Sequence, residues 1–153
     1  MVDEVRVYVE GGGDQKETKI RLRQGFHEFF AELLEGARAK HIRFQIIMGG
    51  PRLKAFDLFR SDVPRYLTAF CVLLVDSEGP VRTPLAECMP DPVAWRRLEL
   101  PDKHCHPMVQ AMEAWLLADV EALERYYGQG FNRRAIPDGL SNVELIPKDQ
   151  LVP

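Results

Sequence analysis

Residues 69–79 read Ala-Phe-Cys-Val-Leu-Leu-Val-Asp-Ser-Glu-Gly, an uninterrupted apolar run followed at once by acidic residues and a glycine. A run of this kind is typical of a strand that is buried on both of its faces. Such strands belong to parallel sheets, because helices cover both sides of those sheets. The stretch therefore predicts a strand over residues 69–75 in an α/β protein, with Asp76 and Glu78 just beyond its carboxyl end.

Two more strands and two helices are predicted ahead of this run. Residues 5–9, Val-Arg-Val-Tyr-Val, predict a first strand that stops at a glutamate and three glycines. Apolar residues at three- and four-residue spacing predict a helix over residues 17–39. Residues 43–48 predict a second strand before another pair of glycines, and residues 52–66 predict a second helix. The β-α-β-α-β order is typical of an α/β layered fold.

The second half of the chain carries weaker patterns. Prolines punctuate residues 80–106, within which residues 97–100 predict a short edge strand. Residues 107–127 are predicted as one long helix, with a proline in its first turn and Gly128 just past its end. Residues 143–146 predict one further strand.

Length and composition predict one globular domain that spans residues 1–153. The formal net charge of −3 argues against a generally basic nucleic-acid-binding surface but allows a local basic groove. The three cysteines are widely spaced and form no Cys-x-x-Cys pair, which disfavours a disulfide framework and a structural zinc site. We find no secretory signal pattern and no apolar run of about 20 residues, so we expect a cytoplasmic protein without a membrane span.

Acidic residues follow two of the predicted strands. Glu10 ends the first strand, and Asp76 and Glu78 follow the third; residues two apart on an extended segment point the same way. Functional groups collect beyond the carboxyl ends of strands in open parallel sheets, so we expect the three carboxylates to meet. Carboxylate oxygens are the ligands that hard cations prefer. The pattern predicts a Mg²⁺ or Mn²⁺ site, and the alternative is that these acids serve only as turn or capping residues.

Three residues in or just before the helix predicted over residues 107–127 are further candidates for this site. Glu113 and Asp119 lie on apolar stripes of the helix, where a carboxylate is costly unless it is paired or bound. Glu113 is therefore a candidate metal ligand, and Asp119 is a further candidate site residue. The alternatives are an ion pair with an arginine for Glu113 and a loop cap for Asp119. His106, just ahead of the helix, can face the same acids.

Basic residues follow both glycine loops. Lys19 and Arg23 share one face of the first predicted helix, and Arg52 and Lys54 follow the second loop. Helix N-termini and nearby cations both favour phosphate. Arg23, Arg52 and Lys54 are therefore candidate phosphate-binding residues, with Lys148 as an additional one. The alternative for each is a solvated helix face.

Three motifs in the chain resemble a known family. The similarity to the domain-of-unknown-function family 4276 spans residues 5 to about 148 and rests on Val9-Glu10-Gly11-Gly12-Gly13-Asp14, Val75-Asp76-Ser77-Glu78 and the block Glu113-Ala114-Trp115-Leu116-Leu117-Ala118-Asp119 that follows His106-Pro107-Met108. That family resembles TOPRIM domains, which occur in topoisomerases, primases and nucleases of the overcoming-lysogenization-defect type. The resemblance implies a single TOPRIM-like domain with a mostly parallel, Rossmann-like sheet and helices on both faces. Relatives usually continue past the Pro147-Lys148 segment into a further helix, so the resemblance leads us to expect a domain in which this C-terminal helix is missing.

The resemblance also implies residue roles and a function. In the TOPRIM pattern Glu10 would be the general acid/base close to the metal, and Asp76 and Glu78 would be metal ligands. TOPRIM domains usually have Asp where this chain has Glu78. A relative is the nuclease of the two-gene PARIS anti-phage system, so the resemblance implies Mg²⁺-dependent cleavage of RNA or DNA in phage defence, beside an ATPase partner. The alternative is a non-catalytic TOPRIM-like module that binds a nucleotide, nucleic acid or the ATPase through the same edge.

Overall fold

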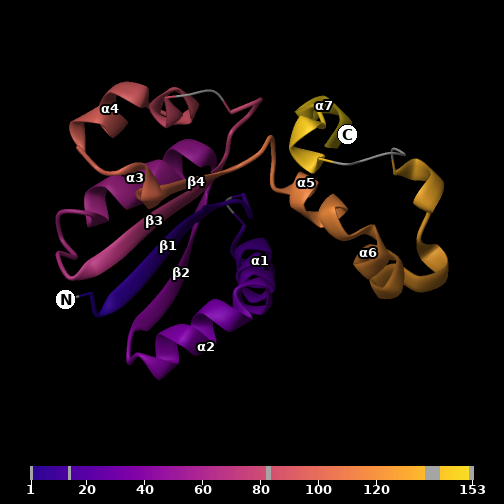
Figure 1. Ribbon diagram of the computed structural model, residues 1–153, viewed down its shortest axis with the longest axis horizontal. Coiled ribbons are helices and arrows are strands. Elements are labelled where there is room, and N and C mark those ends of the chain that lie inside the picture. The colour runs from indigo at the N-terminus through magenta and orange to yellow at the C-terminus, as the bar shows by residue number, and fades with distance from the viewer. Residues whose placement is uncertain (1, 14, 82–83, 137–141, 152–153) are drawn as a thin grey trace.

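The apolar run forms a strand of a four-stranded sheet in which all strands are parallel, as predicted (Figure 1). The strands are β1 (Glu4–Glu10), β2 (Arg43–Gly50), β3 (Ala69–Asp76) and β4 (Cys105–Met108), in the order β2-β1-β3-β4. The computed structural model describes residues 2–13, 15–81, 84–136 and 142–151. The predicted α/β, Rossmann-like class is therefore confirmed.

Helices cover both faces of the sheet because side chains of successive strand residues point to opposite sides. The helices between the strands are α1 (Lys16–Phe29), α2 (Ala31–Ala39), α3 (Arg52–Asp62) and α4 (Pro92–Arg97). Tyr8 and Leu73 pack on one face with Phe56 of α3, whereas Val9 packs on the other face with Phe26 of α1. The two cores together bury the central strands β1 and β3 on both sides.

The long helix predicted over residues 17–39 is two helices. Phe30 separates them, with backbone angles (φ −95°, ψ 18°) outside the helical range, although its N–H still donates to the Phe26 carbonyl at 2.9 Å. The rings of Phe26 and Phe30 stack with centroids 5.7 Å apart, and Phe30 also lies 6.2 Å from Phe44 of β2. Packing against the sheet thus bends a segment whose periodicity is helical throughout.

The predicted helix over residues 107–127 begins later than expected. Cys105–Met108 instead pair in parallel with the end of β3, and Pro107 is tolerated there because β4 is an edge strand. The helical part consists of α5 (Glu113–Leu116), a 3-10 turn η3 (Leu117–Asp119) and α6 (Val120–Tyr127). Gly128 ends α6 with φ +58°, as the sequence predicts.

Both short strands predicted in the second half are wrong. Residues 97–100 lie at and after the end of α4, which starts because the Asp91 carboxylate accepts a hydrogen bond from the Ala94 N–H at 2.9 Å. Val143–Leu145 form a 3-10 turn, η6, that the Asn142 side chain caps, and α7 (Lys148–Leu151) follows. Leu98 and Glu99 continue the turn of α4, because their N–H groups donate to the Trp95 and Arg96 carbonyls, whereas the Asn142 cap fixes η6. The other 3-10 turns are η1 (Leu85–Cys88), η2 (Asp102–His104), η4 (Gly128–Gly130) and η5 (Arg133–Ala135).

An open apolar cavity of about 740 Å³ lies between α2 and the sheet. Val5, Phe70 and Val72 line it from the sheet, and Trp115 and His106 line it from the second half of the chain. No helix within the described residues is long and apolar enough to cross a membrane.

Candidate metal centre

We use the word crevice for the place between the carboxyl ends of the neighbouring strands β1 and β3, where the chain leaves the sheet toward opposite faces. After β1 the chain passes to α1 on one face, and after β3 it passes to η1 and α4 on the other face. Ligands of open parallel sheets bind where neighbouring strands diverge in this way. Glu10 is the last residue of β1 and Asp76 is the last residue of β3, so both carboxylates stand at this crevice.

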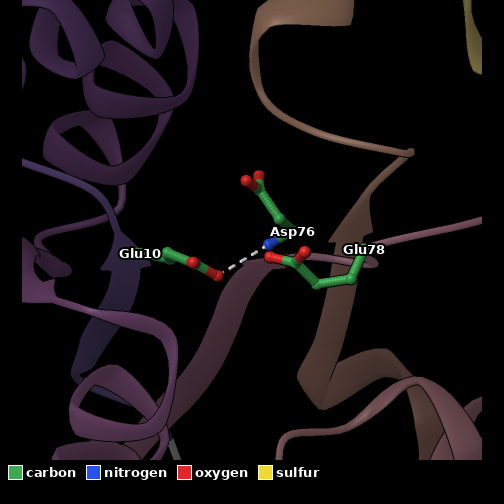
Figure 2. A group of neighbouring side chains, drawn as sticks. All are labelled: Glu10, Asp76 and Glu78. Carbon is green, nitrogen blue, oxygen red and sulfur yellow. Dashed lines mark hydrogen bonds between the residues drawn. The ribbon is translucent and has the colours of Figure 1, made fainter. Parts of the chain in front are cut away.

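Three carboxylates converge in the crevice, as the sequence predicts. Ligand oxygens of Glu10, Asp76 and Glu78 all lie within 4.8 Å of one another (Figure 2). The Asp76 backbone N–H donates to Glu10 Oε2 at 3.0 Å, and the Met112 backbone N–H donates to Asp76 Oδ1 at 2.8 Å. The main chain therefore fixes two of the three carboxylates in position.

Glu78 is held by an extension of the sheet ladder beyond β3. Its backbone N–H donates to the Gln110 carbonyl at 3.0 Å, and the Ser77 N–H donates to the Met108 carbonyl at 3.1 Å. Glu78 has φ +64°, the left-handed region that residues other than glycine rarely adopt. Strained backbone of this kind clusters at functional sites, where surrounding hydrogen bonds enforce it. With this backbone the Glu78 carboxylate lies close to those of Asp76 and Glu10 (Figure 2).

The crevice makes negative charge costly. Burial raises the pKa of Glu10 to about 7, and the charges of Asp76 and Glu78 raise it too, against the opposing effects of the Asp76 N–H and Arg52. Burial also raises the pKa of Asp76, aided by the charges of Glu113 and Glu78. A divalent cation would relieve both effects, because it supplies opposite charge and replaces lost water.

Lys148 meets the acids directly. Its Nζ donates to Glu78 Oε2 at 2.6 Å, and its backbone N–H donates to Gln110 Oε1 at 3.2 Å. Burial lowers the pKa of Lys148, but the hydrogen bond and charge of Glu78 and the charges of Asp76 and Glu10 outweigh it, so the pKa is raised. Of the basic residues named from sequence, Lys148 is the one joined to an acid of this group by a described hydrogen bond.

Lys19 lies over the two glycine loops that border the crevice. The Gly11 N–H donates to the Gly50 carbonyl at 2.9 Å and so joins the loops. A Cβ atom on Gly50 would lie 3.0 Å from Lys19 Nζ, and one on Gly12 would lie 3.1 Å from Lys19 Cα. The absence of side chains at these positions therefore lets α1 begin close to the loops, with the Lys19 ammonium beside them.

The candidate phosphate-binding residues differ in their positions. Arg52, in the first turn of α3, donates to the Cys88 carbonyl, and its charge acts on Glu10. Its Nε is buried without a hydrogen-bond partner among the described residues. Arg23 and Lys54 are exposed on α1 and α3, farther along each helix than Lys19 and Arg52.

The remaining candidates lie at the margin of the site or outside it. Glu113 is the first residue of α5, and its charge raises the pKa of Asp76, but it is not one of the three converging carboxylates. Asp119 caps α6 by accepting a hydrogen bond from the Ala122 N–H at 2.8 Å, which is the alternative considered for it. His106 is exposed on β4 and lines the apolar cavity.

Two residues of the centre carry no signal in the sequence. Gln110 holds both Glu78 and Lys148, and the Met112 N–H holds Asp76. Both lie between β4 and α5, in a segment whose pattern predicts the interior of a helix. This segment holds the site residues through main-chain groups and the buried Gln110 amide, and no pattern of residue types identifies such contacts.

Comparison with known proteins gives one match. The model of a family described as Domain of unknown function (DUF4276) matches residues 9–151, a range that contains all three converging acids. No curated protein and no solved structure matches the chain.

Proposed function

The chain belongs to the DUF4276 family, and we propose that it is a divalent-metal-dependent phosphodiesterase of TOPRIM type that cleaves nucleic acid. The meeting of Glu10, Asp76 and Glu78 within 4.8 Å carries the proposal. One glutamate after the first strand and two acids after the third is the arrangement that the TOPRIM resemblance implies. The same resemblance leads us to propose a role in phage defence in the cytoplasm, beside an ATPase partner.

The residues present suit Mg²⁺ or Mn²⁺. Both ions prefer carboxylate oxygens and keep several waters, and a site open to solvent on the side of Glu78 leaves room for those waters. Asp76 and Glu78 would hold the ion, with Glu113 as a ligand close by. When bound, the ion would activate water and stabilise charge on the leaving oxygen.

Glu10 suits proton transfer. In the metal-free protein burial raises its pKa to about 7, and a bound ion would lower that pKa toward its ordinary value, so that the Glu10 carboxylate can accept a proton from water. Its Oε2 accepts the Asp76 N–H, so Oε1 is the atom that remains for exchange of a proton with water or with a leaving oxygen. We assign Glu10 this role while it also borders the ion.

Basic groups surround the acids where a phosphate would lie. Lys19 stands beside the glycine loops, Arg52 begins α3, and Lys148 contacts Glu78. The N-termini of α1 and α3 add partial positive charge at the same edge. Arg23 and Lys54 continue this surface along the two helices, which suits a polynucleotide better than a single small phosphate.

The test is a cleavage assay on single- and double-stranded RNA and DNA with Mg²⁺ or Mn²⁺. We expect the wild type to cleave at least one substrate, and Glu10→Gln to be slower by about 100-fold or more. Glu35→Gln, an exposed acid on α2, is the matched control and should retain wild-type activity. Equal cleavage by the wild type and Glu10→Gln would remove Glu10 from the mechanism. Metal binding without any cleavage would instead favour the non-catalytic module.

A further inference from the structure

The acidic crevice contains its own cation. Lys148 Nζ lies 2.6 Å from Glu78 Oε2 and is close enough for its charge to act on Asp76 and Glu10 as well. The carboxylate that pairs with Lys148 is thus one of the three that would hold a metal ion.

The backbone of Lys148 is anchored while its side chain has room to move. Ile146, two residues earlier, is only 4% exposed, and the Lys148 N–H bonds to the buried Gln110 side chain. The side chains of Lys148 and Glu78 are 33% and 41% exposed. The ion pair can therefore open by rotation of a partly exposed lysine side chain, without release of the C-terminal segment.

We propose that Lys148 and the metal are alternative counter-ions of Glu78, so that metal binding displaces the ammonium and frees it to bind a phosphate of the substrate. This inference rests on the proposed function. An ammonium and a divalent cation that share one carboxylate repel each other, and the half-buried Glu10 and Asp76 beside them reduce the screening of this repulsion by water.

Two consequences of opposite sign follow from this exchange. Lys148 weakens metal binding, because the metal must displace it from Glu78. Lys148 also strengthens binding of the substrate, but only in the metal-loaded protein, where the ammonium no longer has Glu78 as its partner. Metal therefore binds before nucleic acid. A lysine that only stabilises the fold would produce neither effect.

The first measurement is Mn²⁺ affinity by isothermal titration calorimetry. Lys148→Met should bind Mn²⁺ about tenfold more tightly than the wild type, because it keeps the side-chain length but removes the charge. Lys148→Arg keeps the charge and should stay close to wild type. Lys103→Met, which removes an exposed lysine of η2 just ahead of the start of β4, is the matched control and should also leave the affinity unchanged.

The second measurement is the affinity for a fluorescent oligonucleotide with Ca²⁺ and with EDTA. Ca²⁺ should strengthen binding by the wild type and by Lys148→Arg, and Lys148→Met should lose about tenfold of that gain. Unchanged or weaker Mn²⁺ binding by Lys148→Met would overturn the inference while leaving the metal site intact. Failure of all four proteins to bind Mn²⁺ would overturn the proposed function, and the inference with it.

Discussion

Replacement of Glu10 by glutamine should stabilise the metal-free protein above neutral pH, although it removes a residue of the proposed site. Burial and the charges of Asp76 and Glu78 raise the pKa of Glu10 from 4.5 to about 7. Below pH 4.5, Glu10 is protonated in both the folded and the unfolded protein, so it does not change the free energy of unfolding. As the pH rises from 4.5 to about 7, the unfolded chain releases the proton first, so the wild type loses stability, and the loss is complete above pH 7.

The size of the effect follows from the same pKa. A rise from 4.5 to about 7 corresponds to roughly 3 kcal/mol if nothing screens the charge. Glu10 is only half-buried, and solvent screening reduces the penalty to about 1–2 kcal/mol. Glutamine removes the charge and retains an oxygen that accepts the Asp76 N–H. For a domain of this length the gain is about 3–6 °C in unfolding temperature.

The assay is thermal and urea unfolding in EDTA at pH 8 and pH 5, with Glu35→Gln as the exposed control. We expect Glu10→Gln to exceed the wild type by the stated amount at pH 8 and by about half of that amount or less at pH 5. The control should match the wild type at both values. A gain of equal size at both pH values, or no gain at pH 8, would refute the electrostatic reasoning.

Further outcomes test the ion, the core and the glycine loops. About 1 mM Mn²⁺ should raise the unfolding temperature of the wild type, because an ion that binds only the folded state stabilises it, and Asp76→Asn should abolish most of the rise. Phe56→Ala should lower the free energy of unfolding in urea by about 3–5 kcal/mol, since the ring is fully buried; a loss under about 1 kcal/mol would contradict the packing. Gly50→Ala should cost about 1–3 kcal/mol, because Gly50 has φ +79° and its Cβ would lie 2.7 Å from the Gly13 carbonyl oxygen. An unchanged denaturation midpoint would contradict that loop geometry.

The central strands could be predicted from sequence because their burial requires apolar residues along most of their length. β3 is covered on both faces, so Ala69 to Val75 form a continuous apolar run, and β1 combines β-branched and aromatic residues before three glycines. The convergence of Glu10, Asp76 and Glu78 then follows from the rule that parallel strands end at one edge. These predictions required only local patterns and one topological principle.

The edge strand could not be predicted because its pairing is non-local. Cys-His-Pro-Met carries no alternating pattern. It is extended because its backbone pairs with the edge of β3, from Leu73 to Asp76. The proline that suggested a helix start is compatible with an edge strand as well. Because the helix was predicted to begin at Pro107, the irregular segment between β4 and α5 was not expected. The contacts that Gln110 and Met112 make were therefore missed.

In the site, too, the sequence indicates which residues are candidates but not which residues they contact. Acids at strand ends are visible in sequence, and Lys148 could be named as an additional candidate phosphate-binding residue. Its pairing with Glu78, 70 residues earlier, depends on how the C-terminal segment returns to Gln110 and to the residues just after β3. Asp119 illustrates the opposite case, since a carboxylate on an apolar stripe proved to be a helix cap. A charged residue at helical spacing thus fits both a ligand and a cap until the helix boundaries are known.

Anomalous diffraction from crystals soaked in Mn²⁺ tests the central claim most directly. We predict one Mn²⁺ within about 2–2.5 Å of carboxylate oxygens from Asp76 and Glu78 and next to Glu10, with Lys148 Nζ moved away from Glu78. Mn²⁺ bound elsewhere, or a crevice that still holds the Lys148–Glu78 ion pair and no Mn²⁺ at millimolar concentration, would contradict the account.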